Sequence, residues 1–221
     1  MAIKEVISQL RESLPNHVQL IAISKTHPAE MIAEAYEAGQ RAFGENRPKE
    51  MKEKYEALPK DIEWHMIGHL QTNKIKYIAP FVKLIHSIDS DNLLACIDKE
   101  AAKHNRVIDV LLEVHLAREE SKSGWSADEL DTYIASGKFK EYKNIRLRGM
   151  MTVGSLTDDM NIVEQEFRTL KQMQERYRDM IGEEFDTVSM GMTSDYELAI
   201  ECGSNMVRIG SMIFGARDYS K

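Results

Sequence analysis

Cysteine is scarce in this chain of 221 residues, and long apolar runs are absent. Cys96 and Cys202 are the only cysteines, and they form no C-x-x-C spacing. This pattern excludes a disulfide framework and a zinc site built on paired thiols, and it suits a reducing compartment. No apolar run approaches the roughly 20 residues that a membrane-spanning helix needs. We therefore expect a cytoplasmic protein that does not associate with membranes.

Dense positive charge is also missing. The net charge is −7, and lysine and arginine form no cluster of the kind that grips a phosphate backbone. We therefore expect no nucleic-acid partner. The first residues, 1–14, carry Glu5 and Arg11 among apolar positions and lack a small-residue cleavage site. They indicate an extra N-terminal amphipathic helix and not a signal peptide.

Short apolar runs alternate with polar segments of helical period along the whole chain. The predicted strands are Leu20–Ser24, Arg41–Glu45, Trp64–Gly68, Leu84–Ile88, Val107–Leu116, Ile145–Val153, Thr187–Met190 and Met206–Ile209. The predicted helices lie near 29–39, 48–57, 72–79, 91–104, 127–136, 160–180 and 194–202. Such alternation predicts an α/β fold with a parallel sheet and right-handed crossovers.

Two architectures fit this alternation, an open doubly wound sheet and a closed barrel. Eight units of roughly 25–30 residues match the barrel near its minimum size. An open sheet would usually have a glycine-rich dinucleotide turn after its first strand. Here that turn is residues 24–28, Ser-Lys-Thr-His-Pro, without glycine. The sequence therefore predicts a single (β/α)8 TIM-barrel domain over residues 1–221.

Polar residues end most of the predicted strands, and the active sites of such barrels lie at these carboxyl ends. In chain order the strand ends carry Lys25, Asn46, His65 with Gly68, Ser87, Met151, Ser189 and Arg208. A partly desolvated lysine at a strand end favours the neutral amine that attacks an aldehyde. The alternative is that Lys25 is an ordinary solvated lysine.

The last two predicted βα loops have the composition of a phosphate site. Residues 189–194 and 208–211 contain hydroxyls, glycines and a following helix start, which together favour a dianion. The alternative is that Ser194 only caps a helix and Gly210 only makes a turn.

Other polar residues have ordinary explanations. His65 and His69 are four residues apart but lack an H-E-x-x-H helix, so we predict no metal site and expect packed or hydrogen-bonded histidines. His86 and His115, within strands, invite the same interpretation. The Glu/Lys-rich segment 49–60 is typical of a solvated helix face.

Seven segments together resemble the pyridoxal phosphate homeostasis proteins, also called the proline synthetase co-transcribed family. The matching segments are Ile23–Thr26, Phe43–Asn46, Trp64–Gly68 with Leu70–Lys74, Ser121–Gly124, Leu147–Met151, Ser189–Met192 and Val207–Ser211 continued by Phe214–Arg217. They span nearly the whole chain in the family's order.

The resemblance implies a barrel similar to the N-terminal domain of alanine racemase, with pyridoxal 5'-phosphate as cofactor. It implies that Lys25 forms the Schiff base and that Ser189, Gly210 and Ser211 hold the phosphate, with Thr193 as a weaker candidate.

The resemblance also implies that Asn46 lies near the cofactor ring and that Arg208 faces the pyridine nitrogen. The chain departs from the family at Arg47-Pro48, where Tyr-Val is more usual, and His69 occupies a variable position. Neither departure touches the lysine or the phosphate loops.

An arginine at the pyridine nitrogen disfavours protonation of the ring and weakens it as an electron sink. The tyrosine base that alanine racemases draw from another domain has no counterpart in this chain. We therefore predict no catalytic residue and expect a non-enzymatic carrier or buffer of pyridoxal phosphate. Its partners would be the cofactor and apo forms of enzymes that use it, and the chain would be a monomer or a weak homodimer.

Two other functions stay open from the sequence. One is a weak amino-acid racemase that uses pyridoxal phosphate. The other sets the resemblance aside and is a class I aldolase with Lys25 as its Schiff-base lysine.

Overall fold

A computed structural model describes residues 2–117 and 123–215. Eight parallel strands follow one another around a closed barrel, in the order in which they occur in the chain. They are β1 (Gln19–Ile23), β2 (Ala42–Glu45), β3 (Glu63–Met66), β4 (Leu84–Ile88), β5 (Ile108–Glu113), β6 (Ile145–Met151), β7 (Thr187–Ser189) and β8 (Met206–Ile209). The predicted barrel is confirmed, and every predicted strand is present within three residues of its predicted ends.

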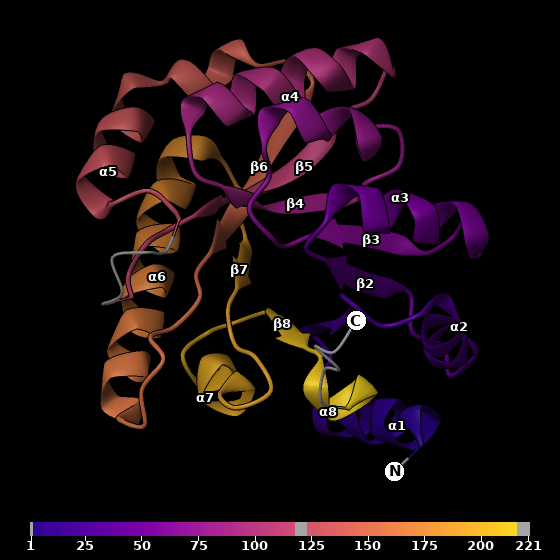
Figure 1. The fold of residues 1–221 in the computed structure, drawn as a ribbon. Helices are drawn as coiled ribbons and strands as arrows, with labels where there is room; N and C mark the ends of the chain where they lie inside the picture. The colour runs from indigo at the N-terminus through magenta and orange to yellow at the C-terminus, as the bar shows by residue number, and fades with distance from the viewer. Residues whose placement is uncertain (1, 118–122, 216–221) are drawn as a thin grey trace.

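The helices surround the strands (Figure 1). They are α1 (Ile3–Ser13), α2 (Ala29–Glu37), α3 (Pro48–Ala57), η1 (Thr72–Tyr77), α4 (Asp91–Lys103), α5 (Ala127–Ser136), η2 (Lys138–Glu141), α6 (Met160–Ile181), α7 (Tyr196–Glu201) and α8 (Ser211–Phe214). The extra N-terminal helix is confirmed as α1, which packs beside α2 and α8. The predicted helix at 72–79 is shorter and of 3₁₀ type.

Capping side chains explain where several helices begin. The Ser90 hydroxyl accepts a hydrogen bond from the Leu93 N–H at the start of α4. Ser126 does the same for Glu129, whose carboxylate in turn accepts from the Ser126 N–H. Each cap satisfies amide groups that the first helical turn leaves unpaired.

Two apolar layers stabilise the barrel. The larger one lies between the strands and the helices. The smaller one fills the barrel interior and consists of Ile21, Ile23, Ala42, Leu84, Leu111, Met151 and Met206. Polar side chains complete that interior, among them His65, His86, Ser189 and Arg208, all at most 4% exposed. Within the described residues, no helix is both long and apolar enough to cross a bilayer.

Candidate functional site

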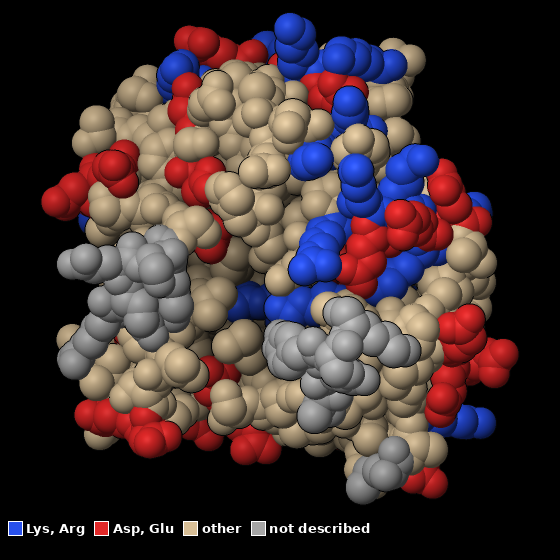
Figure 2. Space-filling view, viewed as in Figure 1, with Lys and Arg blue, Asp and Glu red and all other residues tan. Residues whose placement is uncertain are grey.

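A cavity of about 310 Å³ opens at the carboxyl ends of β1, β3, β7 and β8. Its lining residues are Ile23, Lys25, Ile67, Met192, Thr193, Ser194, Arg208, Gly210 and Ser211. Five of the seven predicted site residues are thus brought together from strands far apart in the sequence. Figure 2 shows a hollow with lysine or arginine side chains near the centre of the ring of strands drawn in Figure 1.

Lys25 lies just past β1, half-buried and directed into the cavity. The backbone on both sides of it is fixed by side chains of α3. The Ser24 carbonyl accepts a hydrogen bond from Lys54 Nζ at 2.9 Å, and the Thr26 N–H donates to Glu50 Oε1 at 2.7 Å. Thr26 is held at φ 68°, a left-handed conformation that a branched residue adopts only where its surroundings impose it.

These contacts belong to one group of mostly buried polar and charged side chains, which we call the lysine clamp and define as Ser24, Glu45, Glu50 and Lys54. Glu45 Oε1 accepts from the Ser24 hydroxyl at 2.6 Å and from Lys54 Nζ at 2.7 Å. Lys54 Nζ also donates to Glu50 Oε1 at 2.7 Å. Burial raises the pKa of the Glu45 carboxyl to about 7, although Lys54 opposes this rise.

The interpretation of segment 49–60 as a solvated helix face is wrong for two of its residues. The Lys54 side chain is only 8% exposed and that of Glu50 only 21%. They lie four residues apart, one turn of α3, and this turn faces the end of β1. A carboxylate ending a buried strand, Glu45, was the sequence signal that a buried cation would be needed to pair with it.

Arg208 forms the floor of the cavity and is 4% exposed. Its guanidinium donates to the Ser189 hydroxyl at 2.7 Å and to the Thr152 carbonyl at 2.8 Å. Burial lowers the pKa of Arg208 to about 10, and the nearby carboxylates of Asp195 and Glu113 partly oppose this shift. The side chain therefore remains a cation at neutral pH, with its orientation fixed.

A second wall of the cavity is made by the two loops that follow β7 and β8. Gly191 has φ +95°, and its carbonyl accepts from the Arg208 N–H at 2.9 Å, which joins the two loops. A side chain at Gly191 would collide with Ala199, 2.6 Å away. The hydroxyls of Thr193 and Ser211 meet at 3.3 Å across the gap between the loops.

The ordinary explanations for these loops, a helix cap at Ser194 and a turn at Gly210, do not describe them fully. The N-cap position of α7 is Asp195 and not Ser194. The Asp195 carboxylate makes no capping hydrogen bond and accepts instead from the Met192 N–H at 2.6 Å. Ser194 is exposed and lines the cavity instead. Gly210 does precede α8, but it also packs against Ile23, so that a side chain there would meet the Ile23 backbone at 3.2 Å.

Ser189 and Asn46 are not among the residues that line the cavity. The Ser189 hydroxyl is buried between Arg208 and His86, whose Nδ1 lies 3.0 Å away. Asn46 packs against Gly68, where a side chain would meet the Asn46 backbone at 2.7 Å.

The four histidines singled out in the sequence differ in burial and in their contacts. His65 and His86 are buried and joined by a ring-nitrogen contact of 2.9 Å, as expected for hydrogen-bonded histidines. His115 is half-buried, and its Nδ1 has no partner. His69 Nδ1 lies 3.1 Å from Asp89. The contact of His86 with Ser189 was the feature that the sequence did not reveal.

Comparison with known proteins identifies the family of this chain. The family model described as alanine racemase, N-terminal domain, matches residues 1–218. A pyridoxal phosphate homeostasis protein of Aquifex aeolicus is 42% identical over 205 residues, 92% of this chain and 89% of the relative. That of Pasteurella multocida is 36% identical over the whole of both chains. The chain belongs to the pyridoxal phosphate homeostasis proteins, within the alanine racemase N-terminal domain family.

Solved structures of this family share the fold. PipY of Synechococcus elongatus, in a structure with pyridoxal phosphate bound, matches with a TM-score of 0.89 and 34% identity. The match covers 96% of this chain and all of PipY. Alanine racemase of E. faecalis matches with a TM-score of 0.72 at 16% identity, and this chain spans 58% of it. The resemblance seen in the sequence is confirmed, and the likeness to alanine racemase is one of fold.

Proposed function

We propose that this chain binds pyridoxal phosphate as a Schiff base on Lys25 and acts as a non-enzymatic carrier or buffer in cytoplasmic pyridoxal phosphate homeostasis. The observation that supports this proposal is the cavity itself. One amine, three hydroxyls and one buried guanidinium line the same space of about 310 Å³. This set of groups suits a phosphorylated aldehyde with an aromatic nitrogen, so the cofactor of the family fits the site.

Lys25 Nζ would supply the covalent bond. In its neutral form the amine attacks the aldehyde carbon, a C=N bond replaces the C=O bond, and water leaves. Hydrolysis reverses the step and releases the aldehyde. The lysine clamp contributes by fixing the backbone carbonyl before Lys25 and the N–H after it, so the amine reaches the cavity from one direction.

The β7–β8 side would hold the phosphate. Thr193 and Ser211 supply hydroxyl donors, and Gly210 lines the same wall without a side chain. Ser194 is a further hydroxyl of this wall that the sequence did not single out. The Ser189 hydroxyl is already engaged by Arg208 and His86. We therefore assign it to the hydrogen-bonded connection between these two side chains and not to the phosphate.

Arg208 would face the pyridine nitrogen. When bound, pyridoxal phosphate can act as an electron sink for carbanion chemistry, and a protonated ring nitrogen strengthens this property. Arg208 is a buried cation, so it disfavours that protonation. It would donate a hydrogen bond to that nitrogen and orient the ring while limiting its chemistry, as a carrier requires.

Transfer of the cofactor tests this proposal. The loaded protein is mixed with an apo-transaminase, and recovery of transaminase activity is compared with that given by free pyridoxal phosphate. We expect transfer from the wild type and none from Lys25→Ala, with Lys76→Ala, an exposed lysine outside the cavity, behaving as the wild type. Absence of transfer together with no lowering of free aldehyde would rule the carrier role out. Deuterium exchange at the α-carbon of an amino acid, above the Lys25→Ala level, would favour the racemase alternative.

A further inference from the structure

A second cavity, of about 330 Å³, lies at the opposite end of the barrel from Lys25. Its lining residues are Gln19, His65, Lys83, Leu84, Asp109, Arg146, Arg148, Thr187 and Met206. Gln19, Thr187 and Met206 are the first residues of their strands, which places this cavity at the amino-terminal opening of the barrel. We call it the amino-terminal cavity.

Positive charge dominates its lining, with Lys83, Arg146 and Arg148 against one carboxylate, Asp109. Arg146 pairs with Asp109 at 2.7 Å. The other two cations have looser partners outside the lining, because Lys83 lies 3.3 Å from Glu63 and Arg148 lies 3.6 Å from Asp186. Exposed pairs of this kind are weak, so they leave the two cations able to bind another anion.

A buried, unpartnered nitrogen also lines this cavity. His65 is 2% exposed, and its Nε2 has no hydrogen-bond partner. Burial lowers the pKa of His65 to about 3 and keeps that of His86 well below its usual range. Each imidazole is therefore neutral at pH 7 and carries a single N–H, whose position the hydrogen-bond network assigns.

The hydrogen bonds that begin at Arg208 determine which ring nitrogen of His86 and of His65 carries the proton. Arg208 can only donate, so the Ser189 oxygen accepts from it. Among the described residues, His86 Nδ1, 3.0 Å away, is the one remaining partner of the Ser189 hydroxyl, so we infer that the hydroxyl donates its proton to that nitrogen. His86 then carries its proton on Nε2 and donates it to His65 Nδ1 at 2.9 Å. The proton of His65 is consequently on Nε2, the nitrogen without a partner. A buried N–H donor beside three cations lacks only an acceptor.

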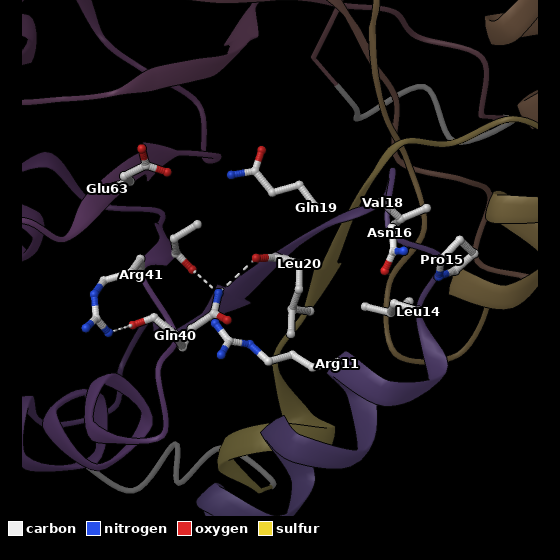
Figure 3. A pocket seen from close by; sticks show the side chains of 11 residues that line it. Arg11, Leu14, Pro15, Asn16, Val18, Gln19, Leu20, Gln40, Arg41 and Glu63 are labelled. Atoms are coloured by element: carbon white, nitrogen blue, oxygen red, sulfur yellow. Dashed lines mark hydrogen bonds between the residues drawn. The ribbon is translucent and has the colours of Figure 1, made fainter.

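A neighbouring cavity differs from the amino-terminal cavity because its buried donor already has hydrogen-bond partners. It has a volume of about 300 Å³ and is lined by Arg11, Gln40, Arg41 and Glu63 among others (Figure 3). There the buried Gln40 amide already donates to the Leu20 and Ala42 carbonyls, at 2.8 and 2.7 Å. Its buried amide donor is satisfied from within the protein, whereas that of His65 is not.

We propose that the amino-terminal cavity binds a small oxyanion of the phosphate class, held by the His65 Nε2–H and by Lys83, Arg146 and Arg148. The same anion would end a hydrogen-bonded chain that begins at Arg208 on the floor of the Lys25 cavity. Because hydrogen bonds in such a chain polarise one another, an anion at one end and a cofactor at the other would influence each other's affinity equally.

Titration with inorganic phosphate tests the site. Protein labelled with ¹⁵N in histidine is first loaded with pyridoxal phosphate, so that the Lys25 cavity is occupied, and loading is followed by visible absorption. Phosphate is then added at constant ionic strength, with chloride as the balancing anion. We expect the His65 Nε2 signal to shift saturably and the His86 signals to follow it, both in the tautomers assigned above.

Two matched variants distinguish a specific phosphate site from nonspecific electrostatic attraction of phosphate to the protein. Arg148→Gln removes a cation from the lining and should weaken phosphate binding about tenfold, the effect of one charged hydrogen bond. Lys76→Gln removes the same charge outside the cavity and should leave binding unchanged. If Arg148→Gln does not fold, Lys83→Gln takes its place.

Three results would overturn the inference: an unmoved His65 signal, an equal shift with chloride alone, or equal weakening by both variants. Failure of the proposed function is seen separately, as a missing visible band before phosphate is added. In that case the titration still reports on the site, because His65 and Arg148 lie at the amino-terminal end.

Discussion

The two walls of the Lys25 cavity are built in opposite ways. On the Lys25 side, the lysine clamp fixes the backbone with buried charged side chains. On the β7–β8 side, glycine turns and backbone hydrogen bonds shape the loops, and the hydroxyls of Thr193 and Ser211 complete them.

This difference has an energetic consequence. A buried ion pair costs several kcal/mol of desolvation and remains favourable only while every partner is present. A wall of backbone and neutral hydroxyls loses about 1 kcal/mol for each hydrogen bond removed. Loss of any one partner of the lysine clamp should therefore destabilise the whole Lys25 side of the cavity. On the β7–β8 side, each hydrogen bond removed should cost a separate, smaller amount of free energy.

The largest effect is expected from Lys54→Met, which leaves Glu45 buried without its cation. We expect a loss of about 3–5 kcal/mol in the free energy of unfolding, measured by urea denaturation. Lys52→Met is the matched control on the same helix, because its pair with Glu56 is solvent-exposed. It should cost less than about 0.5 kcal/mol, and an equal loss in both variants would contradict the clamp.

Next comes the pH dependence of the clamp. The folded protein raises the pKa of Glu45 to about 7 from 4.5, so it binds a proton that the unfolded chain has released. This contribution to stability is complete below about pH 4.5 and is lost as the pH rises through 7, a change of about 3 kcal/mol. Urea denaturation of wild type and Glu45→Gln at pH 4.5 and 8 should show it as a difference that Glu45→Gln lacks. Parallel pH profiles would refute the assignment.

A smaller effect is expected on the other wall from Gly191→Ala. The added methyl meets Ala199 in a left-handed backbone, and the expected cost is about 2 kcal/mol with weaker cofactor binding. Gly137→Ala has similar backbone strain in open space, so it should cost about 1 kcal/mol and leave binding unchanged. Thermal denaturation and cofactor titration of both variants measure the difference, and equal costs would show that the packing of Gly191 does not matter.

The smallest effect is expected from Ser211→Ala. Loss of one neutral hydroxyl should weaken pyridoxal phosphate binding about fivefold and leave the visible band in place at saturation. Titration followed by visible absorption gives the affinity. Loss of all binding would mean that the phosphate side, like the lysine clamp, acts as a unit.

Periodicity was enough to locate the strands, because each is an apolar run bounded by helical segments. The number and size of the units and the glycine-free turn after the first strand then favoured the barrel over the open sheet. The position of Lys25 and of the last two loops followed from the rule that strand ends meet at one opening. The 3₁₀ form of η1 did not follow, since Thr72–Tyr77 has a local pattern compatible with either helix.

The contacts that hold the site in place were beyond the sequence. Lys54 and Glu50 resemble the exposed charges around them, and only the packing of α3 on β2 and β3 buries them. Ser189 was expected to meet a phosphate, yet the contact with His86, 103 residues earlier, depends on barrel register. Such pairings are set by three-dimensional neighbours and not by local pattern.

Reductive trapping shows whether Lys25 forms the Schiff base with pyridoxal phosphate. The protein is incubated with pyridoxal phosphate, reduced with borohydride, digested and mapped by mass spectrometry. We expect a pyridoxyl phosphate adduct on Lys25, at one equivalent per chain. An unmodified Lys25, with the adduct absent or on other lysines, would contradict the assignment of the Schiff base to Lys25.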